Sequence, residues 1–246
     1  MKTKSTIFAL IGWIAGSTFA LYAQTPDAAA ILKQVDVLRN PLESFQIDVE
    51  LTSHRKNESE TWSFRVFGQG YDKSLVEFVA PAVEKGKFML MLRDALWIYM
   101  PNTRKPIRIS PLQRLMGEAS NGDVARTNYG VDYVPSLAGE DVLDGVKTYV
   151  LDLKAKDEDI SYSHVKLWVA KQNYEPIQAE FYVLSGMLMK RAVFREFGIL
   201  NGRRVITGID IHDVRQKGFW THLRYTNLQP KQMADKYFNK NYLGRW

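Results

Sequence analysis

The sequence contains no cysteine among its 246 residues. This absence excludes disulfide bonds, thiol catalysis, cysteine-ligated zinc and the lipidation of an N-terminal cysteine. If the chain is exported, its stability therefore depends on its hydrophobic core alone. We therefore expect that the protein itself is not a lipoprotein.

Sequence motifs for catalysis and metal binding are also lacking. The four histidines are isolated, and none has a partner at metal-ligand spacing. Gly68-Gln69-Gly70 lacks the third glycine of a dinucleotide-binding loop, and it falls between two predicted strands. Asp157-Glu158-Asp159 falls at a predicted hairpin tip, where solvated charge is the usual explanation and a catalytic carboxylate pair is the alternative. The sequence therefore predicts no enzyme, no cofactor and no metal site.

Long apolar runs are scarce, and the one at the N-terminus has a recognisable pattern. Two lysines precede an apolar run over residues 7–19, which is too short for a convincing membrane span, and small residues follow. This pattern predicts a secretory signal peptide over residues 1–23, cleaved after Ala23 or after Ala20. An uncleaved N-terminal membrane anchor is the competing interpretation. Residues 24–246 are expected to form a single soluble domain in the periplasm.

The positive charge of the chain is modest. Removing the two lysines of the leader lowers the formal net charge from +6 to +4. This excess is too diffuse to indicate nucleic acid, although it suits an anionic membrane surface. Outside residues 231–246, which are expected to pack back as a short helix, no basic run contains interleaved aromatic residues.

Most of the chain alternates apolar and polar residues with the period of two that is typical of strands. Before these strands, Thr25-Pro26-Asp27 favours the start of a helix that continues to about residue 39. The alternation stops between residues 110 and 146, where Ser110-Pro111 indicates a second helix start. The predicted strands cover residues 45–51, 62–66, 73–80, 87–92, 95–100, 105–109, 147–154, 162–170, 177–184, 188–197, 203–214 and 219–228.

So many sequential antiparallel strands need closure or cover to protect their edges. The expected fold class is mainly β (α+β). It is an incomplete, strongly curved antiparallel β-barrel of about 11–12 strands, with an N-terminal helix and short lid helices. The connection over residues 110–146 is expected to act as the lid, because long connections often cover binding sites.

One hairpin is apolar on both faces. In KFMLMLRDALWIYMPNTRKPIRIS, residues 87–110, apolar side chains take consecutive positions, whereas a solvated sheet has one polar face. A curved sheet of this size encloses more volume than its own side chains fill, so one face is expected to line a cavity and the other to be covered. An ordinary core beneath the N-terminal helix is the alternative. The expected lining residues are Trp62, Phe64, Met89, Met91, Trp97 and Tyr99.

Two further groups of residues complete the hypothesis. A lid is expected at Leu112, Leu115 and Met116. Contact with a lipid headgroup or an anionic membrane is expected at Arg93, Arg104 and Lys105, with solvated turn charge as the alternative.

Five stretches carry a resemblance to a known family, and together they span essentially the whole chain after the leader. They are GKFMLMLRDALWIYMPNTRKPIRIS at 86–110, NGDVARTNY at 121–129, VKLWVAKQNYEPIQAEFY at 165–182, SGMLMK at 185–190 and YFNKNYL at 237–243. In their order and spacing they resemble the outer-membrane lipoprotein-sorting proteins of the LolA/LolB-like superfamily, and more closely a largely uncharacterised periplasmic branch of it. The resemblance implies a Gram-negative periplasm and an incomplete β-barrel that encloses acyl chains under a helical lid. No ligand residue of the archetypal carrier can be aligned onto this chain.

The function that this resemblance implies is that of a carrier or chaperone for the acyl chains of a lipoprotein or lipid. The implied partner is an inner-membrane exporter or transporter, and the modest positive charge adds transient contact with a membrane surface and no nucleic acid. Two alternatives belong to other classes. One is an interaction or signalling module that senses lipoproteins, which usually needs a second domain, and the other is a secreted lipid or glycan hydrolase, which the missing nucleophile motif disfavours.

Overall fold

The computed structural model describes residues 26–70, 72–93, 95–125, 129–158, 160–214 and 218–245. The predicted signal peptide lies outside these residues. No helix in the described part of the chain is long and apolar enough to cross a membrane.

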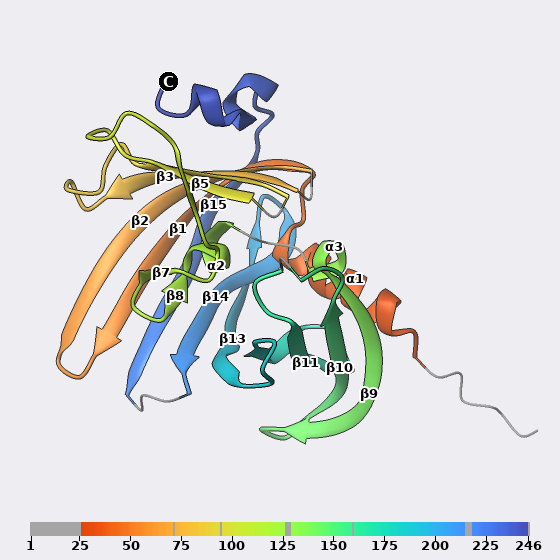
Figure 1. The fold of residues 1–246 in the computed structure, drawn as a ribbon. Coiled ribbons are helices and arrows are strands. Elements are labelled where there is room, and N and C mark those ends of the chain that lie inside the picture. The colour runs from red at the N-terminus through yellow and green to blue at the C-terminus, as the bar shows by residue number, and fades with distance from the viewer. Residues whose placement is uncertain are drawn as a thin grey trace, which may run out of the picture.

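Thirteen antiparallel strands form one sheet that curls without closing (Figure 1), so the predicted fold class is confirmed. The strands are ordered β6-β5-β4-β3-β2-β1-β15-β14-β13-β12-β11-β10-β9, and β15 pairs with β1 in the interior of the sheet. Their bounds are β1 Ser44–Arg55, β2 Glu58–Gln69, β3 Lys73–Ala80, β4 Phe88–Leu92, β5 Ala95–Tyr99, β6 Ile107–Ile109, β9 Tyr133–Leu143, β10 Val146–Ala155, β11 His164–Ala170, β12 Pro176–Tyr182, β13 Leu188–Leu200, β14 Arg203–Asp213 and β15 Phe219–Pro230.

The N-terminal helix α1 (Ala28–Arg39) packs on the concave face of this sheet. Its cap is Asp27, whose carboxylate accepts a hydrogen bond from the Ala29 backbone N–H at 2.9 Å. Thr25, whose hydroxyl the Thr25-Pro26-Asp27 pattern favours as the cap, lies outside the described residues. Ile31, Leu32 and Val35 form the buried stripe of the helix, and α1 contacts β9 and β14.

The connection between the two halves of the sheet is shorter than the sequence predicts. Residues 133–143 form β9, a mostly exposed edge strand whose glycine, proline and polar residues obscure the period-two pattern. The helix predicted after Ser110-Pro111 is wrong, because Ser110 Oγ accepts from the Leu112 backbone N–H at 3.2 Å in a turn. A small hairpin follows instead, with strands β7 (Arg114–Met116) and β8 (Ala119–Ser120), and then the short helices α2 (Asn121–Ala125) and α3 (Tyr129–Asp132).

The C-terminal tail folds back over the convex face of the sheet (Figure 1). It contains two 3₁₀ turns, η1 (Asp235–Phe238) and η2 (Lys240–Tyr242). Phe238 and Leu243 pack there against Phe67, Leu75 and Leu90. The two-sided hairpin is therefore covered on its outer face by the tail.

Candidate functional site

The concave face of the sheet carries the main hydrophobic core. Strands of both halves contribute to it, and α1 covers part of it. Period-two alternation places these side chains on one face because successive residues of a strand point to opposite sides. Core residues of the concave face include Val49, Leu51, Phe64, Leu151, Leu167, Ile209, Ile211 and Leu223.

A segment of the connection fills the hollow of this face (Figure 1). We call residues 110–125, which contain β7, β8 and α2, the plug. Met116, Ala119, Val124 and Ala125 of the plug are all buried in the same cluster as the concave strands. The plug therefore occupies the part of the half-barrel in which a bound ligand would be expected.

Neutral hydrogen bonds and one tight turn hold the plug against the sheet. The Glu118 backbone N–H donates to Thr221 Oγ1 at 2.7 Å, and Ser74 Oγ donates to the Ala125 carbonyl at 2.6 Å. Gly117 turns the hairpin with φ +55, and a Cβ at this position would lie 2.3 Å from Thr221 Oγ1 and 2.5 Å from Ser53 Oγ. Only glycine fits this turn at this distance from the sheet.

An ion pair also joins the plug to the sheet. Asp123 of α2 pairs with Lys190 of β13, which is 6% exposed. Asp123 also accepts from the backbone N–H of Ser120 at 2.7 Å and from its hydroxyl at 2.9 Å. The Lys190 ammonium lies 4.8 Å from the ring centre of Tyr162 and 5.1 Å from that of Phe181. Burial alone would lower the pKa of Lys190, but the Asp123 carboxylate and the Tyr162 hydroxyl together outweigh it and raise that pKa above its ordinary value.

The far end of the connection is tied to α1. The Asp36 carboxylate accepts from the backbone N–H groups of Tyr129 at 2.8 Å and Gly130 at 2.7 Å. Burial raises the pKa of Asp36 although both hydrogen bonds oppose this shift. The Arg39 guanidinium lies 4.6 Å from the ring centre of Tyr129. Charged groups thus fasten the connection at α2 and again at α3 inside a mainly apolar fold.

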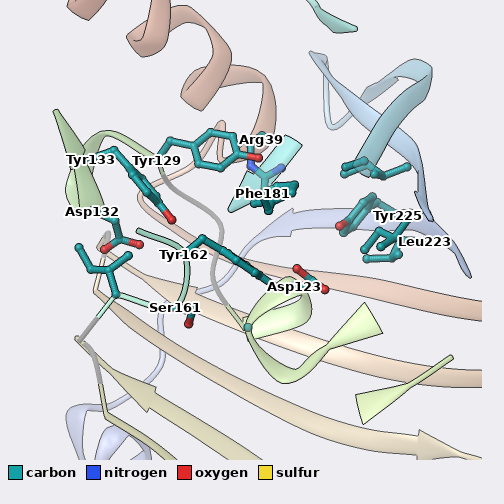
Figure 2. Close-up of a pocket in the computed structure, with 15 residues that line it drawn as sticks. Arg39, Asp123, Tyr129, Asp132, Tyr133, Ser161, Tyr162, Phe181, Leu223 and Tyr225 are labelled. Carbon is teal, nitrogen blue, oxygen red and sulfur yellow. The ribbon is translucent and has the colours of Figure 1, made fainter. Parts of the chain in front are cut away.

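A small cavity of about 60 Å³ remains between the plug and the sheet (Figure 2). This volume holds a few water molecules at most, whereas ligand pockets usually measure about 300–1,000 Å³. Ser161 Oγ, which lines the cavity, is buried without a hydrogen-bond partner among the described residues. The polar and aromatic lining includes Arg39, Asp123, Tyr129, Tyr162 and Tyr225, and the apolar floor includes Ile209, Ile211 and Leu223.

A second hollow of about 130 Å³ lies at the mouth of the concave face. Leu112 and Arg114 line it from the plug, and Met189 and Lys190 line it from β13. Tyr162 borders both this hollow and the inner cavity. Displacement of the plug would therefore join the two spaces into one channel along the sheet.

The six residues expected to line one cavity lie on two faces of the sheet. Trp62, Phe64, Met89 and Met91 belong to the core of the concave face. Trp97 and Tyr99 lie on the convex face under the tail.

The register of the hairpin explains this separation. Trp97 pairs with Leu90 and Tyr99 with Phe88, and directly paired residues of an antiparallel ladder point to the same side. Met89 and Met91 alternate with Phe88 and Leu90 along β4, so they point to the opposite side from the two aromatic residues.

The expected lid residues are placed differently from one another. Met116 is buried in the concave core, Leu115 packs partly against it, and Leu112 is 41% exposed at the mouth. The predicted headgroup contacts Arg104 and Lys105 are exposed in the turn after β5.

Arg93 is also highly exposed, in the turn between β4 and β5. Its guanidinium lies 3.9 Å from the Asp72 carboxylate. These three basic residues therefore lie away from the inner cavity, which is lined by other residues.

Sequence reasoning missed the buried charges. Lys190 stands in the same phase of β13 as Ala192 and Phe194, so a lysine occupies an inward position on an apolar strand. This mismatch is the signal that could have identified it. Asp123 could not have been found in this way, because α2 is too short to show a period.

The raised pKa of Tyr225, which lines the inner cavity, predicts that the protein loses stability at alkaline pH. Burial raises its pKa to about 12 although the Arg39 guanidinium opposes this shift. An unfolded chain loses this proton near pH 10, so stability falls as the pH rises from about 10 to 12, by up to about 3 kcal/mol. Tyr225→Phe is expected to reduce this alkaline loss in urea unfolding measured between pH 8 and 12. Tyr174→Phe, at an exposed ring, is the control, and an unchanged pH profile in Tyr225→Phe would contradict the assignment.

Comparisons with known proteins agree with this architecture. A family model described as "Uncharacterized protein" matches residues 70–245, and no curated protein matches the chain. Among solved structures, the chain is similar to the LolA superfamily protein NE2245 from Nitrosomonas europaea, with 35% identity and a TM-score of 0.82 over 89% of this chain and 100% of that one.

Two more distant structures share the fold. One is a DUF1329 family protein from Desulfovibrio piger, with 23% identity and a TM-score of 0.75 over 88% of this chain and 97% of that one. The other is a candidate outer membrane lipoprotein-sorting protein domain from Vibrio parahaemolyticus, with 22% identity and a TM-score of 0.74 over 89% and 98%. Given its identity to the Nitrosomonas protein over that protein's full length, the chain belongs to the LolA superfamily.

Proposed function

We propose that the protein is a periplasmic carrier for the acyl chains of a lipoprotein or another lipid, and that the plug occupies the acyl site while no cargo is bound. The observation that carries the proposal is the position of the plug. It covers a continuous apolar concave face, and its own apolar residues are buried where hydrocarbon would lie. The family membership and the sorting role given to the Vibrio relative support the same function.

The energetics favour exchange of the plug for cargo. A sixteen-carbon chain gains roughly 10 kcal/mol on burial before ordering costs, at about 0.8 kcal/mol per methylene. When the plug leaves, it loses its two neutral hydrogen bonds to the sheet and its ion pair, and its buried apolar side chains meet water, so these losses offset part of that gain. An acyl chain can therefore displace the plug, whereas the closed state protects the apolar face in the absence of cargo.

The donor and acceptor follow from the same proposal. A carrier of this kind accepts its cargo from an inner-membrane exporter or transporter and releases it at another envelope membrane. A module that senses lipoproteins would bind a protein receptor without lipid, and a hydrolase would turn over ester or glycoside substrates. Either result would show that the protein is a sensor or a hydrolase and not a carrier.

Gly117→Ala is expected to raise the affinity for a fluorescent fatty acid by about tenfold. The added methyl group collides with Thr221 and Ser53, so the plug is loosened and the cost of opening the site falls. Gly202→Ala is the matched control, because Gly202 has φ +71 and a Cβ there meets nothing within 4 Å. Both variants carry comparable backbone strain, but only Gly117→Ala disturbs the plug.

Gly117→Ala, Gly202→Ala and the parent chain are titrated with the same fluorescent fatty acid, and their affinities are compared. Native mass spectrometry of the protein purified from periplasm is expected to show a co-purifying lipid or acylated peptide. A bare mass together with no fatty-acid binding by either Gly117→Ala or the parent chain would overturn the carrier function.

A further inference from the structure

The positive charge of the chain is concentrated in two segments. Residues 84–108 and 231–246 together contain ten of the 33 lysines and arginines but only three of the 27 aspartates and glutamates. Their formal net charge is +7, whereas the whole chain carries +6. The rest of the molecule therefore has almost no net charge, and the basic character of the protein belongs to these segments.

The fold brings these two segments together on the convex side of the sheet. The tail packs on β3, β4 and β5, and the Lys240 ammonium lies 5.8 Å from the ring centre of Trp97. Trp97 in turn pairs with Arg108 of β6, so Arg108 points to the same face. Figure 1 shows the tail and the loop that follows β5 at the same end of the molecule. We call the exposed residues Lys85, Arg93, Arg104, Lys105, Arg108, Lys231, Lys236, Lys240 and Arg245 the basic surface.

Most of this charge is not neutralised within the protein. In the described part of the chain, no carboxylate lies within ion-pair distance of Arg104, Lys105 or Arg108. Lys236 lies over the rings of Tyr237 and Tyr242, at 5.1 and 5.3 Å from their centres. The surface thus keeps a strong positive potential for an external partner.

Its other side chains indicate what that partner is. Half-buried tryptophan and tyrosine rings alternate with the cations, and Val83 and Ile107 are 80% and 44% exposed beside them. Gly86 lies in the same turn as Val83. A Cβ atom at Gly86 would lie 3.4 Å from Cγ of Pro101, so this turn approaches the neighbouring loop closely. Lysine and arginine mixed with aromatic and exposed aliphatic residues are typical of segments that lie at a membrane interface.

We propose that the basic surface docks the protein on an anionic phospholipid membrane. The lysines and arginines contact the headgroups, while Val83 and Ile107 enter the interfacial region. This surface is distinct from the concave face, so the inference does not depend on what fills the interior. A carrier that docks by its convex side leaves the mouth of its half-barrel free.

The test is cosedimentation with vesicles of phosphatidylcholine that contain about one third phosphatidylglycerol. We expect binding at low salt that is lost as the salt rises to about 500 mM, because the Debye length shortens. The triple variant Arg104→Gln, Lys105→Gln, Arg108→Gln is expected to bind about 100-fold more weakly, at about fivefold for each basic residue.

A triple variant elsewhere provides the matched control. Arg55→Gln, Lys154→Gln and Arg203→Gln remove the same charge from exposed positions outside the basic surface, so binding is expected to stay within about threefold of the parent chain. Fatty-acid binding in vesicle-free solution is expected to be the same in all three proteins, which separates docking from carriage.

Three results would overturn the inference. The first is the absence of binding to the anionic vesicles at low salt, and the second is equal binding to vesicles of pure phosphatidylcholine. The third is an equal loss of binding in both triple variants, since the effect would then follow total charge. If an acidic polypeptide such as polyglutamate binds in a salt-dependent way while vesicles do not, the partner of the surface is an acidic protein and not a membrane.

Discussion

Replacing Lys190 with methionine is expected to lower the free energy of unfolding by about 3 to 5 kcal/mol. The substitution leaves the Asp123 carboxylate of the plug inside the concave core without its cation. The cost comes from the unpaired buried charge and not from lost packing, because methionine fills nearly the same space. Urea unfolding at neutral pH, followed by tryptophan fluorescence, measures the change.

A second substitution separates this cause from a simple loss of structure. Asp123→Asn in the Lys190→Met background removes the charge but keeps an oxygen that can accept from Ser120. The double variant is expected to recover to within about 1 kcal/mol of the parent chain. Lys171→Met is the surface control, because Lys171 pairs with the exposed Glu140 and its loss costs about 1 kcal/mol or less. If the double variant is no more stable than Lys190→Met, the ion pair is not what fastens the plug.

Phe238→Ala is expected to cost about 3 to 5 kcal/mol and to release the C-terminal tail from the sheet. Phe238 is 5% exposed in the convex cluster, where it packs with Phe67 and Leu90. Release of the tail would expose the outer side of β4 to water. Thermal unfolding measures the stability, and limited proteolysis after Lys236 or Lys240 reports the release directly.

Tyr242→Ala provides the comparison within the same tail. Tyr242 is only half-buried and stacks edge-on with Tyr237 at 5.5 Å, so its removal is expected to cost less than half as much. Equal losses in the two variants would show that the tail is held by its turns and not by the insertion of Phe238.

The alternation of apolar residues was enough to predict the curved antiparallel sheet. Strands such as β1 and β2 bury one face only, so their period of two is visible in the sequence. β9 was missed because an exposed edge strand buries almost nothing and needs no apolar alternation. The hairpin at Arg114–Met116 was missed because three residues are too few to show any period.

The interior of the site was harder to predict for a different reason. Whether a face of β4 meets the plug or the tail depends on segments far away in the chain, and nothing local distinguishes the two apolar faces. Pairing of Met89 with Ile98 and of Leu90 with Trp97 would have separated the two sides once the hairpin register was applied. The pairing of Asp123 with Lys190 joins residues on separate elements, and a single sequence does not show such a contact.

The pairing of β1 with β15 has a consequence for how the molecule folds. Each half of the sheet is a meander of hairpins that can form locally, but the seam between the halves joins Val49 to Tyr225. Closing so long a loop is entropically costly, so this seam is expected to form late and slowly. Until the last strand arrives, each half exposes an unpaired edge at the future centre of the sheet. Chaperone protection during biogenesis would be needed most at that edge.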